Sequence, residues 1–376
     1  RRTYIDLFQP VINKTIKKTS GFIKDSRYYF YDLNSKIVFK PTDKDRFIID
    51  FYLGADSYNL TKPDYHLDFN LGWGNTAYSI RWNRVFNPSL LMNQVSGFTS
   101  YAYKMNGTFE DYTLSLASKV EDWFHKSDFT LITGSGRFKA GSEYVFHTIT
   151  PSSVNASSES FGHNTVFKLI SHELAGFING EFDLSEKLTL NAGFRLNAYG
   201  QTGPYTNYLK DLSGQINDSI LYGRSDLITK YLTPETRLSL HVYISGVSSF
   251  KSSYSRNYQT IHLITVGSVS LPTDIWMPST GTLKPELVNQ YTAGYFTSFF
   301  ENDFTCSAEA YYKEMKNQLE FKNSLLIQFE NSEFEDNIAY GTGRSFGAEF
   351  YLRKNKRGFT GWISYTISLT TPKFKD

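Results

Sequence analysis

The chain has 376 residues, a net charge of +2 and an aromatic content of 17%, with 31 Phe and 27 Tyr. A near-neutral charge argues against a nucleic-acid-binding protein, which would carry a basic face or run. The sequence has no run of about eighteen apolar residues, so it predicts no transmembrane helix. A membrane-spanning barrel remains open, because its strands direct only every second side chain into lipid.

The two ends and the single cysteine add little chemistry. Cys306 excludes an intramolecular disulfide framework, and it shares parity with apolar neighbours. We therefore interpret it as a small apolar side chain of a strand and not as a reactive thiol. The opening residues RRTYIDLFQP lack a charged region followed by an apolar core, so we expect any signal peptide to be absent from this sequence.

Alternation of apolar and polar side chains with a period of two predicts seven hairpins. In chain order the predicted strand pairs are 28–40 with 46–56, 67–86 with 90–104, 123–133 with 138–149, 173–183 with 188–199, 231–243 with 249–259, 288–298 with 304–315, and 343–353 with 359–370. The clearest case is LTLNAGFRLNAY at 188–199, in which Phe194 falls on the apolar parity and Asn191 and Arg195 on the polar one.

The arms of the last hairpin, Gly343 to Thr370, are about a dozen residues long, roughly twice a usual globular strand. Each would extend about 40 Å, which a tilt near 45° reduces to about the thickness of a bilayer's hydrocarbon core. For one such hairpin alone, a soluble sandwich would be the better interpretation. Because the same pattern repeats in seven predicted hairpins, a membrane barrel is the better interpretation of the whole chain.

The connections alternate between tight turns and long polar segments. Tight turns are expected near residues 43, 88, 135, 185, 246, 301 and 356, and long connections at 57–66, 106–121, 151–172, 200–230, 262–286 and 316–342. This alternation is typical of outer-membrane barrels. The predicted fold is all-β, an antiparallel up-and-down transmembrane β-barrel with about fourteen strands present, and residues 1–376 form one partial outer-membrane β-barrel domain.

No residue pattern indicates catalysis. The seven histidines have no HExxH or paired His/Cys spacing, and GxSxG, Walker and dinucleotide motifs are missing from the sequence. We therefore expect neither an enzyme nor a bound metal or cofactor.

Candidate ligand-binding residues fall into two groups. The polar parity of the strands, which would face the barrel interior, carries Arg195, Arg237 and Glu349, either as paired charges lining a polar interior or as guides for an ionic substrate. The second group lies in and just before the 262–286 connection, and it contains Tyr258, His262, Asp274 and Trp276. Trp276 could stack on a ligand, but packing of its loop onto the barrel rim is the favoured interpretation.

The sequence also resembles a known family. The segments KSSYSRNYQTIHLI, SVSLPTDIWMPSTGTLKPELVNQYTAGY and LAGFINGEFDLSEKLTLNAGFRLN, with the hairpin GTGRSFGAEFYLRKNKRGFTGWISYTIS, resemble the barrel of TonB-dependent outer-membrane receptors, especially the branch common in Bacteroidota. The resemblance covers nearly the whole chain, and the order of the segments is more specific than any one of them.

The resemblance implies an energised importer in the outer membrane of a Gram-negative bacterium, with a barrel of about twenty-two strands and an N-terminal plug. It implies the TonB energy-transducing system as a partner, a surface lipoprotein as a further partner, and a siderophore, glycan, cobalamin or peptide as ligand. Because no plug precedes Arg1, we expect the chain to be the middle of a longer receptor. The alternatives are a plugless barrel that serves as a docking scaffold in an outer-membrane complex, and a soluble β-rich adhesin or carbohydrate binder.

Overall fold

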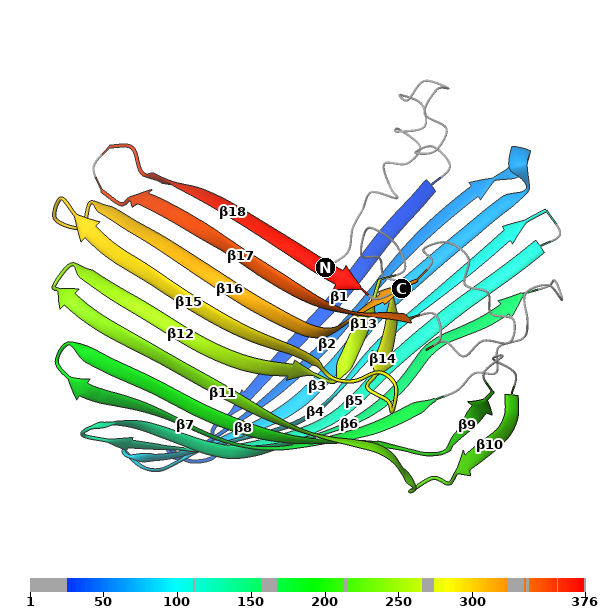
Figure 1. Ribbon diagram of the computed structural model, residues 1–376, viewed down its shortest axis with the longest axis horizontal. Coiled ribbons are helices and arrows are strands. Elements are labelled where there is room, and N and C mark those ends of the chain that lie inside the picture. Colours follow the sequence, from blue (N-terminus) through cyan, green and yellow to red (C-terminus); the bar gives the residue numbers. More distant parts are fainter. Residues whose placement is uncertain are drawn as a thin grey trace.

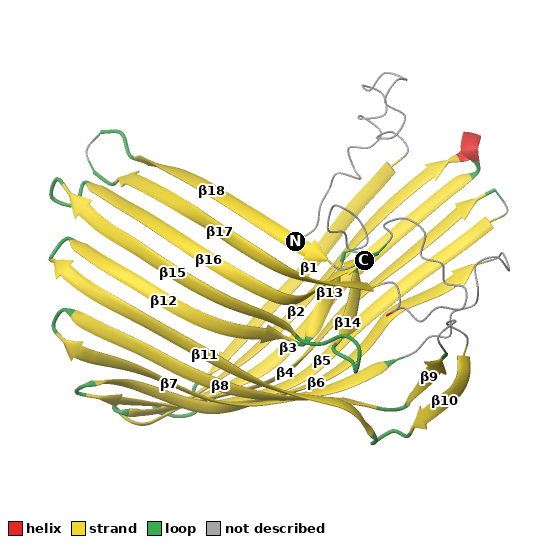
Figure 2. Cartoon of the chain, in the orientation of Figure 1, coloured by secondary structure: helices red, strands yellow, loops and turns green. Residues whose placement is uncertain are grey.

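Strands make up nearly all of the computed structural model, which describes residues 26–110, 112–156, 168–211, 216–265, 274–322, 335, 338–356 and 358–374. The colouring of Figure 2 shows one short helical turn, the 3-10 turn η2 (Pro63–Tyr65), beside the strands. Within these described ranges, no helix is long and apolar enough to cross a membrane.

Fourteen strands form one antiparallel sheet that curves into a trough (Figure 1). In spatial order they are β1 (Ser26–Phe39), β2 (Asp45–Lys62), β3 (Leu67–Asn87), β4 (Leu90–Phe109), β5 (Tyr112–Thr133), β6 (Gly136–Ala156), β7 (Leu169–Ser185), β8 (Leu188–Thr202), β11 (Leu227–Ser245), β12 (Ser248–Gln259), β15 (Glu286–Phe299), β16 (Phe304–Phe321), β17 (Ile338–Lys354) and β18 (Gly361–Phe374). Two small hairpins interrupt this order: β9 (Tyr205–Lys210) with β10 (Ile216–Tyr222), and β13 (Ile261–Ile264) with β14 (Ile275–Pro278).

The seven predicted hairpins are confirmed, and so is the all-β antiparallel fold. Each predicted tight turn joins the expected two strands, from residues 40–44 between β1 and β2 to residues 355–360 between β17 and β18. Because the strands alternate in direction, all seven turns lie at one end of the sheet, which we call the turn end. The other end, which we call the loop end, carries the remaining connections.

Two of the predicted long connections are wrong. Residues 106–121 were expected to form a loop, but β4 continues to Phe109 and β5 begins at Tyr112. Similarly, most of 57–66 belongs to β2. The strands β3 to β6 each contain 20 to 22 residues, about 65 to 70 Å of extended chain. They therefore project beyond a bilayer, where the outer face needs no apolar side chains and the alternation that reveals a strand is lost.

The two faces of the sheet follow the predicted parities. Phe194 of β8 lies on the outer, convex face with 44% of its surface exposed, whereas Tyr199 on the other parity is 2% exposed on the inner, concave face. Cys306 pairs with Leu352 on the outer face, and its side chain is half-buried. The inner face carries the polar side chains, as a barrel that spans lipid requires.

We expect arginine to be tolerated very differently on the two faces of β8. Phe194→Arg places a charge against lipid and should cost roughly 2 to 4 kcal/mol of unfolding free energy if it lies near the bilayer midplane, while Asn191→Arg on the inner face should cost much less. A denaturant titration of the protein refolded into lipid vesicles measures both. Equal costs at the two positions would contradict the assignment of faces.

Candidate functional site

The β13–β14 hairpin lies inside the trough rather than beyond its rim (Figure 1). Its strands pair His262 with Met277 and Leu263 with Trp276. β14 contacts β6 and β5 on one wall, and β13 contacts β16 on the other. The hairpin that carries Trp276 therefore folds back into the interior and bridges the two walls, whereas the role of the Trp276 ring itself stays a prediction.

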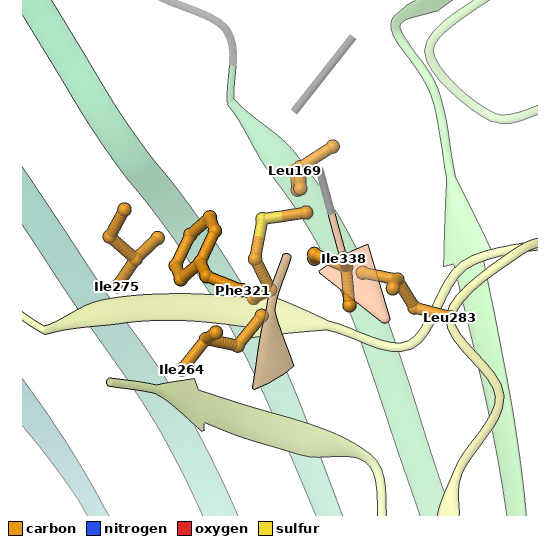
Figure 3. Close-up of a cluster of buried hydrophobic side chains, with 7 residues drawn as sticks. Leu169, Ile264, Ile275, Leu283, Phe321 and Ile338 are labelled. Carbon is orange, nitrogen blue, oxygen red and sulfur yellow. The ribbon is translucent and has the colours of Figure 1, made fainter. Parts of the chain in front are cut away.

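An apolar cluster fixes the hairpin at the loop end of the trough (Figure 3). Its buried members are Leu169, Ile264, Ile275, Met277, Leu283, Phe321 and Ile338. Three of the seven come from the β13–β14 hairpin, Leu283 follows β14, and the other three lie at the loop ends of β7, β16 and β17. Complete burial stabilises such a side chain by about 1.5 to 3 kcal/mol, so the cluster holds the hairpin against strands far apart in sequence.

His262 is completely buried and connects the two sides of the hairpin base. Its Nε2 is 2.9 Å from Ser279 Oγ, and its Nδ1 is 3.3 Å from Glu286 Oε1. The other oxygen of Glu286 accepts a hydrogen bond of 2.7 Å from Gln318 Nε2 on β16. The imidazole therefore couples the returning segment of the hairpin to β15 and, through Glu286, to β16.

A second set of polar contacts joins the hairpin to the opposite wall. Thr260 Oγ1 donates to Glu173 of β7, and the hydroxyl of Tyr199 on β8 donates to the carbonyl of Ser279. The hydroxyl of Tyr231 on β11 donates to the carbonyl of Thr280 over 2.6 Å. The two tyrosine bonds satisfy backbone carbonyls that would otherwise be buried without partners.

Glu173 extends this network along the wall. Its Oε2 accepts from Asn197 Nδ2 over 3.4 Å, and its Oε1 lies 3.8 Å from His147 Nε2. The other nitrogen of His147 is 2.7 Å from Asp122 Oδ1. The polar wall under the hairpin thus runs across β5, β6, β7 and β8.

A basic depression of about 310 Å³ lies on the inner face nearer the turn end. Its cations are Lys126, Lys139, Arg195 and Arg237. Three carboxylates pair with them, from Glu143, Asp128 and Glu235. The Arg195 to Glu143 contact is 2.8 Å and the Arg237 to Glu235 contact is 3.8 Å. The depression therefore has one more cation than carboxylate.

An aromatic wall, defined as Tyr28, Trp73, Tyr101 and Tyr103, covers the inner face of β1, β3 and β4 near the loop end. Tyr28 stacks on Trp73 with ring centroids 6.3 Å apart, and its hydroxyl donates to Asp56 Oδ1 over 2.5 Å. Trp73 and Tyr103 are cross-strand neighbours. The parity of Tyr28 turns its ring toward the interior of the trough.

The predicted candidates separate into three groups. His262, Asp274 and Trp276 come together in the hairpin, where Asp274 interacts electrostatically with Tyr101 of the aromatic wall. Arg195 and Arg237 both line the basic depression.

The remaining two candidates lie elsewhere. Tyr258 is on the outer parity of β12, with the Arg256 guanidinium carbon 5.3 Å from its ring centroid. Glu349 is on β17 between Glu309 and Thr366. The structure thus places Tyr258 away from the interior and Glu349 outside both groups.

Sequence reasoning missed Glu173, His147, Tyr199 and the aromatic wall. Parity alone could have placed each of them on the inner face, because each sits on the polar side of its strand. Parity assigns a side chain to a face of the sheet, but it does not show which side chains contact the hairpin. Thr260 and Glu173, for example, are in contact although they are 87 residues apart in the sequence. In the described part of the chain, no group of three or more His, Cys, Asp or Glu residues is placed to hold a metal ion.

The geometry defines a membrane β-barrel wall whose interior is polar and whose loop end is bridged by an inward-folded hairpin. Residues 11–375 match the TonB-dependent receptor-like β-barrel family, and the chain belongs to this family. It is accordingly an outer-membrane β-barrel protein of the Gram-negative type. No curated protein sequence matches the chain.

Solved structures show the same fold at low sequence identity. The ferric yersiniabactin uptake receptor FyuA from Yersinia pestis is 11% identical with a TM-score of 0.61, over 93% of this chain and 52% of that receptor. The alcaligin receptor FauA from Bordetella pertussis is 13% identical with a TM-score of 0.56, over 92% and 53%. The Serratia marcescens hemophore receptor HasR, in complex with its hemophore HasA and heme, is 13% identical with a TM-score of 0.59, over 91% and 54%. The chain spans about half the length of these structures.

We expect His262→Leu to loosen the hairpin. The substitution removes the partner of Ser279 Oγ and of one Glu286 oxygen, and each buried polar group left without a hydrogen bond costs about 1 to 3 kcal/mol. Amide hydrogen exchange of residues 274–283 should then accelerate roughly fivefold to hundredfold. The control is Leu263→Ala, which trims the adjacent, partly exposed side chain. Unchanged exchange in His262→Leu would contradict the role of the imidazole.

Proposed function

We propose that the chain is the barrel wall of a TonB-dependent receptor that takes up a scarce or large ligand across the outer membrane. The observation that carries the proposal is the hairpin that bridges β6 and β16, in a chain of this family. An interior bridged in this way does not offer the open channel of a porin. A ligand has to bind and displace part of the interior before it passes.

The inner face supports an iron chelate that carries rings and acidic groups as the ligand. The aromatic wall offers ring faces near the loop end, and the basic depression offers an excess cation nearer the turn end. One protein with the same fold is described as an alcaligin receptor and another as a ferric yersiniabactin uptake receptor. A glycan, cobalamin or a peptide would use the aromatic wall without needing the excess cation.

The TonB energy-transducing system is the partner that this proposal requires, because a bridged interior needs a source of work to open. A surface protein that delivers the ligand is a second proposed partner. The complex of HasR with its hemophore supports the idea that a barrel of this fold can bind a partner protein.

Uptake by the full-length receptor in its own outer membrane tests the function. A deletion strain should stop accumulating radiolabelled ferric chelates that the wild type imports, and the gene should restore import only while the TonB system is active. A panel with labelled glycans, cobalamin and peptides identifies the ligand class. Unchanged uptake of all four classes after deletion would instead favour the plugless docking scaffold.

Arg237→Gln tests the charge of the ligand. If the excess cation of the depression guides an acidic chelate, the half-saturation concentration for uptake should rise about twofold to fivefold, the scale of an exposed ion pair. The matched control is Arg353→Gln, an exposed arginine at the turn end of β17 outside the depression. An equal effect of both substitutions would show that the depression has no special role.

A further inference from the structure

The outer face of β4, β5 and β6 carries polar side chains where a lipid-facing wall should be apolar. One row in register across four strands contains Gln94, Ser127, Ser142 and Gly176. The next row toward the loop end contains Ser96, His125 and Tyr144. We call the six side chains of these rows, apart from the glycine, the polar patch.

The register places the polar patch on the outer face. His125 and Ser127 share the parity of Trp123 and Phe129, which are 51% and 45% exposed. The opposite parity of β5 carries Lys126, which lines the basic depression on the inner face. The outer face of the neighbouring strands is apolar at the same level, with Ile80 on β3 paired to Ser96 and Leu174 on β7 paired to Tyr144.

Aromatic side chains bracket the polar patch along the strands. Toward the loop end, Trp123 packs against Phe98 and Tyr78, with ring centroids 4.7 and 5.9 Å away. Toward the turn end lie the exposed Phe129 and Leu131. Trp123 and Phe129 are about 20 Å apart along the strand, or about 14 Å in depth at a tilt of about 45°. The outward-facing apolar band of a membrane barrel is about 25 Å tall, so these exposed side chains and the polar patch between them fit within it.

Hydrogen bonds inside the polar patch use only part of its capacity. Ser96 Oγ is 2.7 Å from His125 Nδ1, and Gln94 Nε2 donates to Ser127 Oγ over 3.3 Å. An imidazole has a second nitrogen, and an amide and a hydroxyl can each make further bonds. A polar group that faces acyl chains without a hydrogen-bond partner costs free energy, so contact with lipid is unfavourable for the polar patch.

The glycine in the row leaves the surface open to close approach. A Cβ atom added to Gly176 would meet nothing within 4 Å, so packing within the chain does not require glycine at this position. Ser127 and Ser142 beside it are also small. Small side chains at a lipid-exposed surface allow another backbone to come close, and polar ones form hydrogen bonds across such an interface.

We propose that the polar patch is the contact surface between two copies of this chain in the membrane. Serine, glutamine, histidine and tyrosine side chains both donate and accept hydrogen bonds, and the polar patch holds no Asp, Glu, Lys or Arg. The same patch on a second copy therefore complements it through a two-fold axis. A partner with charged residues would instead place a charge without an opposite charge within the membrane, which is costly. This interface is independent of the ligand site, because it lies on the opposite face of the sheet.

Site-directed cross-linking in native outer membranes tests the interface. In the full-length receptor with Cys306→Ser, single substitutions Ser127→Cys and Ser142→Cys should give a product of twice the receptor mass with a short thiol cross-linker. The matched control, Leu238→Cys, places a thiol on the exposed apolar outer face of β11 and should give several-fold less product. Equal yields at all three positions, or no product at the two serines, would overturn the proposal.

The mass of the product and a second variant separate the remaining outcomes. A cross-linked product that contains a different protein would overturn the second copy as the occupant. In the Ser142→Cys background, Gln94→Leu with His125→Leu should lower the dimer yield at least fivefold, while heat-modifiable electrophoretic mobility shows that the barrel is folded. An unchanged yield in this folded variant would also overturn the proposal.

Discussion

The backbone hydrogen bond between neighbouring strands is the interaction on which this structure depends. Within lipid no water is available to pair with N–H and C=O groups, so each strand must pair along its length. The sheet meets this requirement by antiparallel ladders, such as the eighteen consecutive pairs between β2 and β3. Since this pairing leaves the side chains to alternate, one face is free to match lipid and the other to match a polar interior.

This constraint explains how much the sequence could predict. Inside the bilayer, pairing of the strands makes apolar and polar side chains alternate along each strand. The pattern around Phe194 and Arg195 therefore identified the strand, its two faces and the adjoining turns. Outside the bilayer the constraint disappears, and the extended strand ends near Phe109 and Tyr112 were mistaken for a loop. Of the candidate site, the pattern placed Arg195 and Arg237 on the inner face, where the structure has them, whereas it assigned no face to Tyr258, which turns outward.

The hairpin could not be predicted, because its position depends on contacts between distant segments. Its sequence has only short strands, and nothing local distinguishes a loop that folds inward from one that projects outward. The information lies in complementary burial: Ile275 and Met277 meet Phe321, while Ser279 accepts from Tyr199. One side of the hairpin is thus held by apolar packing and the other by hydrogen bonds, and the two can respond differently to a ligand.

The rim of the barrel is uneven at the loop end. Between β4 and β5 only residues 110 and 111 connect the strands, whereas the segment from β8 to β11 carries the β9–β10 hairpin (Figure 1). A large particle in the medium, such as an antibody or a bacteriophage, would therefore encounter two kinds of surface at this end, the ends of the long strands β3 to β6 and the β9–β10 hairpin. Of these two surfaces, the long strands are the ones that continue inward to the aromatic wall on β1, β3 and β4.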